Sequence, residues 1–300
     1  MGVAHGDYRA PMRTHVGRRS DGDAQVAVGT GPPPVAVVAG YTVVAYAMTW
    51  VVVAPLALAG LGVLDVQPPA WLHILGALGP AVGAAAMTWR SQGSRGLAQL
   101  WDRIWNPRRI RGRWWLVVLS PLLLVAATAA VVVPFDPPAA IDGPRLLIAV
   151  VGSLSYGVFE EIGWRGFLLP RLQAHMTAIR ASGWVFVIWA LWHLPMFAYQ
   201  LPRGLVAIGW IVGLYYGSVW LAMLHNGTAG SVLACIVWHA GYNVAVTAGA
   251  ELSPLVPAVV TTMVVIATIM AVRRVGTEDL GTRGRFMIAA HTSAAGAARS

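Results

Sequence analysis

The chain has 300 residues, of which 57% are hydrophobic and only 11% are charged, and its mean hydropathy is +0.64. Because a soluble domain carries about 25% charged residues, this composition indicates an integral membrane protein. The net charge is +9, but the arginines fall in loops between apolar runs and form no basic face interleaved with aromatic residues. We therefore expect the charge to set membrane orientation, and we expect no nucleic acid partner. The single cysteine, Cys235, excludes a disulfide framework.

Eight apolar stretches are candidates for transmembrane helices, each of which needs about 20 residues. They are residues 35–64, 71–89, 114–135, 146–161, 183–199, 205–224, 229–250 and 255–272. Most arginines lie in the two loops at 90–113 and 160–182 and in the two ends of the chain, which places all four on the cytoplasmic side. The sequence thus predicts an all-α, polytopic integral membrane protein with about eight transmembrane helices and both termini cytoplasmic.

The remaining segments are polar. Residues 1–34 and residues 274–300 are rich in small and charged residues, which predicts disordered cytoplasmic tails on either side of one eight-helix domain at 35–273. Residues 95–111 and 166–180 alternate apolar residues and arginines at helical spacing, which predicts two amphipathic helices in the cytoplasmic interface.

Few ionisable side chains lie in the apolar stretches, where they are costly and indicate function. They are Glu160 and Glu161 at the end of the fourth stretch, His193 in the fifth, and His239 in the seventh, where Asn243 follows one turn later. His73 lies near the outer end of the second stretch, where we expect it to be interfacial. His193 and His239 each lie about 15 Å from the predicted cytoplasmic end of their helix. We expect the two imidazoles to meet Glu160 in a membrane-embedded cavity that faces the cytoplasm.

The two adjacent glutamates have different expected roles. Glu161 and Arg165 are four residues apart on a helix, which predicts an ion pair. Glu160 lies about 100° around the helix from Glu161, so it is free to face the cavity. A carboxylate and a neutral imidazole can hold a water molecule and deprotonate it, and we assign this role to Glu160 and His193.

His239 and Asn243 share one helix face and are placed to donate hydrogen bonds to a developing oxyanion. With Glu160 and His193 they describe amide hydrolysis without a covalent intermediate. The sequence predicts no cofactor, but a divalent metal such as zinc, held by Glu160, His193 and His239, remains an alternative because two histidines and a glutamate form a known catalytic ligand set.

Three motifs together resemble a known family. They are Glu160-Glu161-x-x-x-Arg165-Gly166, Trp189-x-x-x-His193 and His239-x-x-x-Asn243. In this order, over residues 152–246, they resemble the CAAX prenyl protease and bacteriocin-processing (CPBP, Abi-type) family of intramembrane endopeptidases.

The resemblance implies a glutamate-type endopeptidase in which Glu160 and His193 activate water. It also implies that the histidine and asparagine of the third motif form the oxyanion site, and that Glu161, Arg165 and Trp189 support the site. The family usually has phenylalanine at the position of Trp189, which predicts a changed pocket shape and retained chemistry.

The resemblance implies a membrane-anchored or hydrophobic peptide or protein as substrate. The replacement of all lysines by arginine resembles the composition of a high-GC bacterium, which predicts a location in the bacterial inner (plasma) membrane and argues against a prenylated substrate. Three alternatives remain. They are a non-catalytic protein of the same fold that binds hydrophobic peptides, as a bacteriocin immunity protein or scaffold; a transporter or proton relay that uses the same ionisable groups; and a haem protein ligated by His193 and His239.

Overall fold

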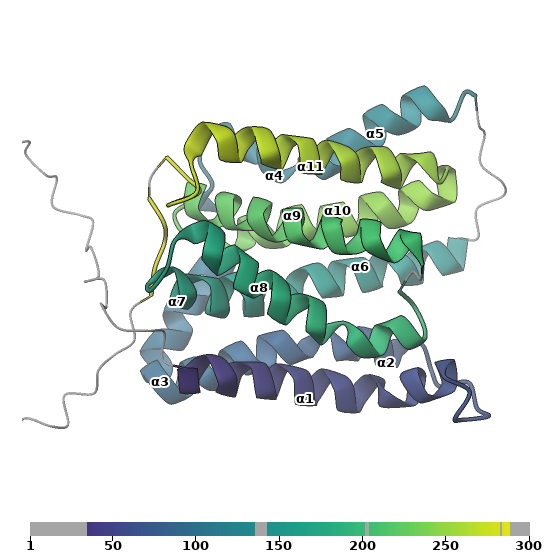
Figure 1. Ribbon diagram of the computed structural model, residues 1–300, viewed down its shortest axis with the longest axis horizontal. Coiled ribbons are helices and arrows are strands. Elements are labelled where there is room, and N and C mark those ends of the chain that lie inside the picture. Colours follow the sequence, from purple (N-terminus) through teal and green to yellow (C-terminus); the bar gives the residue numbers. More distant parts are fainter. Residues whose placement is uncertain (1–34, 136–142, 202–203, 283, 289–300) are drawn as a thin grey trace, which may run out of the picture.

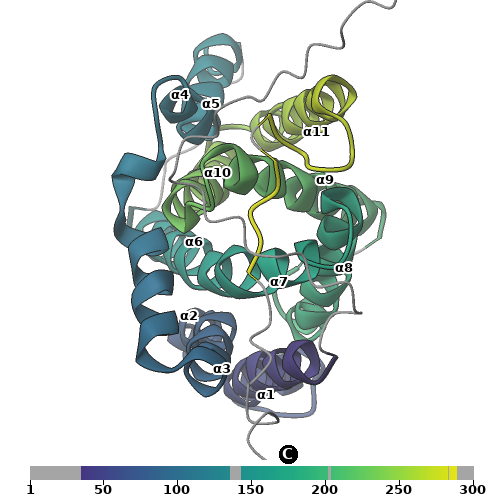
Figure 2. The same cartoon turned by 90° about the vertical axis from the view of Figure 1, so that its left-hand side faces the viewer.

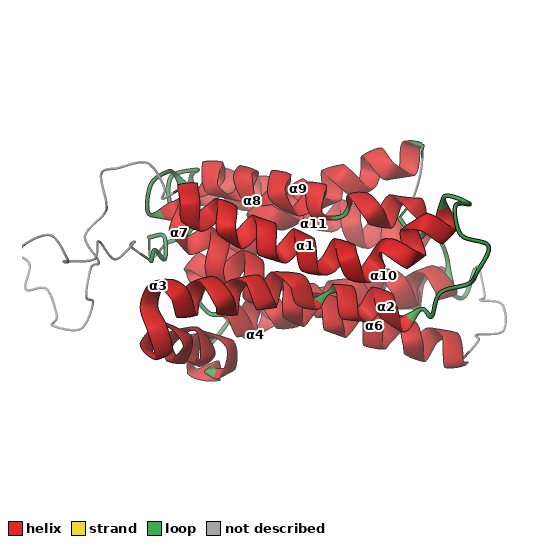
Figure 3. Ribbon diagram, turned by 90° about the horizontal axis from the view of Figure 1, so that it is seen from below, coloured by secondary structure: helices red, strands yellow, loops and turns green. Residues whose placement is uncertain are grey.

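The computed structural model describes residues 35–135, 143–201, 204–282 and 284–288, and all the regular elements in these residues are helices (Figures 1 and 3). Most helices run side by side along the long axis of the molecule (Figure 1). Six helices are long and apolar enough to cross a membrane, namely Val35–Gly60, Trp71–Trp105, Leu146–Gln173, Val206–Gly227, Val232–Leu252 and Leu255–Val275. The chain is therefore a multi-pass membrane protein, as its composition predicts.

The elements in chain order are α1 (Val35–Gly60), α2 (Trp71–Gly76), α3 (Leu78–Trp105), the 3₁₀ turn η1 (Pro107–Arg109), α4 (Trp114–Val118), α5 (Ser120–Val132), α6 (Gly143–Gly163), the π-helical turn η2 (Trp164–Leu168), α7 (Leu169–Gln173), α8 (Ala178–Trp192), the 3₁₀ turn η3 (Leu194–Ala198), α9 (Leu205–Gly227), α10 (Val232–Leu252) and α11 (Leu255–Val275).

Two of the eight predicted spans are built from shorter helices. The stretch at 114–135 is divided into α4 and α5, and α5 has 13 residues. The stretch at 183–199 is divided into α8, with 15 residues, and η3. Each stretch contains one proline near the division, Pro121 and Pro195, and proline has no N–H group with which to continue a helix. Within the described residues the structure therefore supports six long spans, while the sequence predicts eight.

The outer helices bury only one narrow stripe of side chains. The buried residues recur every fourth position, at Tyr41, Ala45, Thr49 and Val53 in α1 and at Val256, Val260, Val264 and Thr268 in α11. The other faces of these helices are apolar and exposed, with side chains such as Val51 and Met270 more than 60% accessible. An apolar face of this kind suits contact with lipid hydrocarbon.

α6 and α10 pack along each other at the centre of the molecule (Figure 2). A Cβ atom at Gly157 would lie 2.5 Å from the backbone N and Cα atoms of Ala240, so only glycine allows this approach. Small residues at helix contacts of membrane proteins permit such close packing. Ala240 is next to His239 in α10. The close approach at Gly157 therefore places His239 beside α6, the helix that carries Glu160 and Glu161.

The prediction of an interfacial amphipathic helix at 166–180 is wrong. α6 instead continues through η2 into α7, and residues 164–173 are buried. Pro170 has no N–H to donate to the Gly166 carbonyl, and the helix widens here into a π turn. The guanidinium of Arg103 donates to that carbonyl instead. The paired glutamates therefore lie inside a continuous helical rod and not at the end of a span.

The C-terminal segment is ordered over part of the region predicted to be disordered. α11 extends to Val275, and the segment that follows it crosses the end of the helix bundle towards α7 (Figure 2). The carbonyls of Thr277 and Glu278 accept hydrogen bonds from the first two N–H groups of α8, at 3.2 and 2.7 Å. These contacts satisfy donors that the start of any helix leaves unpaired. The predicted tail at 1–34 and residues 289–300 lie outside the described residues.

Two buried amides hold this C-terminal segment. The side chains of Gln173 and Asn226 donate to each other at 3.1 and 2.8 Å. Asn226 also binds the Asp279 carbonyl at 2.7 Å and the Phe286 N–H at 3.1 Å, and Gln173 donates to the Phe286 carbonyl at 2.8 Å. The structure places Asn226 at the end of α9, where it is the main polar contact of the C-terminal segment.

We predict that Gly157→Ala destabilises the protein, because the added methyl group must displace the backbone of α10. Overpacking of this kind costs about 1–3 kcal/mol. Gly152→Ala, on the same helix, is the matched control, since a Cβ there meets no atom within 4 Å. The measurement is the melting temperature of both variants in the same detergent. Equal melting temperatures would show that α6 and α10 are not in this close contact.

Candidate active site

The structure brings most of the predicted site residues together at the centre of the fold. Glu160 and Glu161 come from α6, Arg165 from η2, Trp189 from α8, His193 from the residue after α8, and His239 and Asn243 from α10. The first six are buried, with side chains of 7% exposure or less, and Asn243 is half-buried. Charged groups buried to this degree require specific partners.

Glu161 accepts two charge-assisted hydrogen bonds at one oxygen. Its Oε1 atom lies 2.7 Å from Nη1 of Arg165 and 2.8 Å from Nδ1 of His239. The ion pair expected from the four-residue spacing is present, and it extends to a histidine on another helix. The guanidinium of Arg165 also lies 4.8 Å from the centre of the Trp189 ring, a cation–π contact. Glu161 therefore links α6, η2 and α10.

Glu160 has a different set of partners. Its Oε2 atom accepts hydrogen bonds from two indole N–H groups, those of Trp164 at 3.1 Å and of Trp189. Within the described part of the chain, the other carboxylate oxygen, Oε1, makes no hydrogen bond. The two glutamates thus serve separate groups, one ionic and one neutral. Each keeps one oxygen without a partner among the described residues, Oε1 of Glu160 and the fully buried Oε2 of Glu161.

The hydrogen-bond partners fix the tautomers of both histidines. Nδ1 of His193 lies 2.8 Å from the backbone carbonyl of Trp189, and Nδ1 of His239 lies 2.8 Å from the Glu161 carboxylate. A carbonyl or a carboxylate can only accept, so each Nδ1 atom carries the proton and each neutral ring has a lone pair at Nε2. His193 is therefore suited to accept a proton, whereas His239 can donate from Nε2 only as an imidazolium.

The sequence predicts that His193 lies within a helix. The structure places it at the end of one. It is the C-cap residue of α8, and Pro195 prevents the helix from continuing. The carbonyl of Trp192, next to His193, accepts a hydrogen bond from the indole of Trp50 at 3.0 Å. The imidazole packs edge-to-face against the rings of Trp192 and Trp210, at 4.8 and 5.0 Å.

Asn243 lies one turn after His239 on α10, as the sequence predicts. Among the described residues its amide makes no hydrogen bond, so its N–H groups are available to a ligand. Trp164 was not predicted as a site residue. Its position four residues after Glu160 is the signal that could have identified it, because residues at this spacing share a helix face.

The donor geometry does not fit the alternative metal site. Across the ranges that the structure describes, no group of three His, Cys, Asp or Glu side chains is arranged to hold a metal ion. Glu160, His193 and His239 therefore do not form such a group in the described structure.

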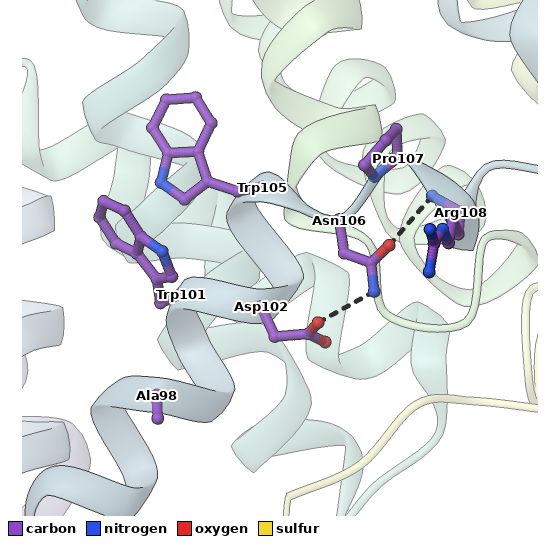
Figure 4. Close-up of a pocket in the computed structure, with 7 residues that line it drawn as sticks. All are labelled: Ala98, Trp101, Asp102, Trp105, Asn106, Pro107 and Arg108. Carbon is purple, nitrogen blue, oxygen red and sulfur yellow. Dashed lines mark hydrogen bonds between the residues drawn. The ribbon is translucent and has the colours of Figure 1, made fainter.

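A surface hollow lies apart from this site. It is formed by residues 98–108 at the end of α3 and in η1, beside the exposed rings of Trp101 and Trp105 (Figure 4). Its polar groups bind each other, since Asn106 donates to Asp102 at 2.9 Å and accepts from the Arg108 N–H at 3.1 Å. None of the residues that line the hollow belongs to the three predicted motifs.

Part of the chain is similar to a known family. Residues 142–245 match the model of a family described as type II CAAX prenyl endopeptidase Rce1-like. This range contains all seven predicted site residues. The curated protein CAAX prenyl protease 2 from Methanococcus maripaludis is 42% identical over 38 residues, which are 13% of this chain and 14% of that protein. The chain therefore matches well under two thirds of the length of this relative.

We predict that Arg165→Met lowers the free energy of unfolding by about 3–5 kcal/mol, because it leaves the Glu161 carboxylate buried without its guanidinium. Arg109→Met is the matched control. Arg109 pairs with Asp102 at 2.7 Å on the surface, with side chains 28% and 46% exposed, and an exposed pair contributes about 1 kcal/mol or less. Thermal unfolding in detergent measures both variants. Equal losses of stability would contradict a central role for the buried pair.

Proposed function

Residues 142–245 carry a domain of the Rce1-like type II CAAX prenyl endopeptidase family, and we propose that the protein is an intramembrane glutamic endopeptidase. The substrate is a membrane-anchored or hydrophobic peptide or protein. The observation that carries the proposal is the buried Glu160 carboxylate, which is held by neutral donors at Oε2 and has Oε1 free. A general base needs an accessible lone pair in a fixed position, and this carboxylate meets that requirement.

Water activation is the first step of the proposed mechanism. A water molecule donates one hydrogen bond to Oε1 of Glu160 and one to Nε2 of His193, the two lone pairs that the described contacts leave open. As the water oxygen attacks the carbonyl carbon of the scissile peptide bond, its proton passes to Glu160. A positioned general base of this kind contributes about 10²–10⁴-fold in rate.

The tetrahedral intermediate places a negative charge on the former carbonyl oxygen. The amide of Asn243 donates one hydrogen bond to this oxyanion. His239 donates a second from Nε2 when its ring is an imidazolium, and the Glu161 carboxylate at Nδ1 balances that charge. Donors fixed in advance at an oxyanion are usually the largest single contribution to acyl transfer.

Collapse of the intermediate breaks the C–N bond. Glu160 returns the proton to the leaving nitrogen, which departs as an amine, and the acyl part departs as a carboxylic acid. The carboxylate of Glu160 is regenerated and no covalent bond to the protein forms. Cys235 takes no part, because it is buried and donates weakly to the backbone carbonyls of Leu221 and Ser231.

We also propose eight membrane crossings, with α4 and α5 together forming one and α8 with η3 forming another. An even number places both chain ends on one side. The start of α1 and the end of α11 lie at the same end of the bundle, which supports this topology (Figure 1). The arginine-rich loops favour the cytoplasmic side for that end, in the plasma membrane of a bacterium.

We predict that Glu160→Ala abolishes peptide release, with a loss of at least about 100-fold, because it removes the general base. The measurement compares, by mass spectrometry, the peptides released from membranes that contain the wild-type protein or the variant. Glu251→Ala is the matched control, since Glu251 is an exposed residue at the end of α10. We expect this variant to be as active as the wild type.

Equal peptide release by Glu160→Ala and the wild type would contradict the protease function. It would favour a non-catalytic membrane protein of the same fold that binds hydrophobic peptides.

A further inference from the structure

Trp189 contacts four other buried residues of the site. The indole N–H of Trp189 donates to Glu160, its ring lies under the Arg165 guanidinium at 4.8 Å, and the ring meets His239 edge-to-face at 5.3 Å. Its backbone carbonyl accepts from Nδ1 of His193 at 2.8 Å. The side chain is 3% exposed. Trp189 is thus buried and held by contacts on several sides.

The two indoles that bind Glu160 differ in what they connect. Trp164 follows Glu160 by one turn in the same helical rod, so its hydrogen bond at 3.1 Å is local. Trp189 reaches Glu160 from α8, the helix that ends at His193. Of these two contacts, only the one from Trp189 fixes the Glu160 carboxylate relative to α8 and His193.

The side chain and the backbone of Trp189 therefore act on the two water-activating groups at the same time. The side chain holds Oε2 of Glu160, which leaves Oε1 for the water. The carbonyl holds the proton of His193 at Nδ1, which leaves Nε2 for the same water. A change in the position of Trp189 would alter the distance between these two acceptors.

We propose that Trp189 is a positioning residue for water activation, and that its indole N–H is the group that holds the Glu160 carboxylate in position. This inference rests on the proposed function. In this chain the N–H orients the Glu160 carboxylate towards the water. A phenyl ring, the usual side chain of the resembled family at this position, supplies no donor, so the dependence on the N–H is a property of this chain and not of the family. A hydrogen bond to a charged group contributes about 1.5–3 kcal/mol, and each 1.4 kcal/mol is a factor of ten.

The test compares the kinetics of Trp189→Phe and Trp220→Phe on a peptide substrate identified by mass spectrometry. We expect Trp189→Phe to lower kcat about 10- to 100-fold and to leave KM within about twofold, because it disturbs the chemical step and not substrate binding. Trp220→Phe is the matched control. The Trp220 indole N–H is buried without a partner in the described residues, so we expect kcat within about twofold of wild type.

A second variant removes the N–H group alone. 3-Benzothienylalanine at position 189 keeps the shape of tryptophan and replaces the N–H with sulfur, so it tests the hydrogen bond even if Trp189→Phe fails to fold. We expect the same loss of kcat. A wild-type kcat for this variant, or a Trp189→Phe that matches Trp220→Phe, would overturn the inference. Activity in Glu160→Ala would instead overturn the proposed function, so the two failures are distinguishable.

Discussion

The carboxylate of Glu161 is the point on which the central fold depends. It accepts at one oxygen from Arg165 at 2.7 Å and from His239 at 2.8 Å, with all three side chains buried. A charge in the interior of a membrane protein is costly, so it persists only with such partners. These contacts bring α6, η2 and α10 together, and Gly157 allows the backbones to approach closely enough for the imidazole to reach the carboxylate.

The same arrangement gives two adjacent glutamates different chemistry. Glu161 is committed to cationic and imidazole donors and serves the structure. Among the described residues, Glu160 accepts hydrogen bonds from two indole N–H groups, which orient the carboxylate without adding a positive charge. The proposed division of labour follows from these partners, and Trp189 connects the two halves of the site because its ring packs against Arg165 while its N–H binds Glu160.

Much of the site follows from local spacing, whereas the errors arise from distant contacts. The Glu161–Arg165 pair follows from a separation of four residues on a helix, and the polar residues in apolar stretches identify the helices that meet. The π turn at 164–168 depends on Arg103, which satisfies a carbonyl that Pro170 cannot. The order in the C-terminal segment depends on Asn226, a residue more than 50 positions earlier. Composition and periodicity contain no information about such partners.

The most direct test of this account compares Glu160→Gln with Glu161→Gln in one purified preparation, by melting temperature and by rate of peptide release. We expect Glu160→Gln to melt like the wild type and to be inactive, because an amide oxygen still accepts from the indoles but cannot take a proton from water. We expect Glu161→Gln to melt at a lower temperature, because Arg165 loses its counter-charge. An active Glu160→Gln, or a Glu161→Gln as stable as the wild type, would contradict the account.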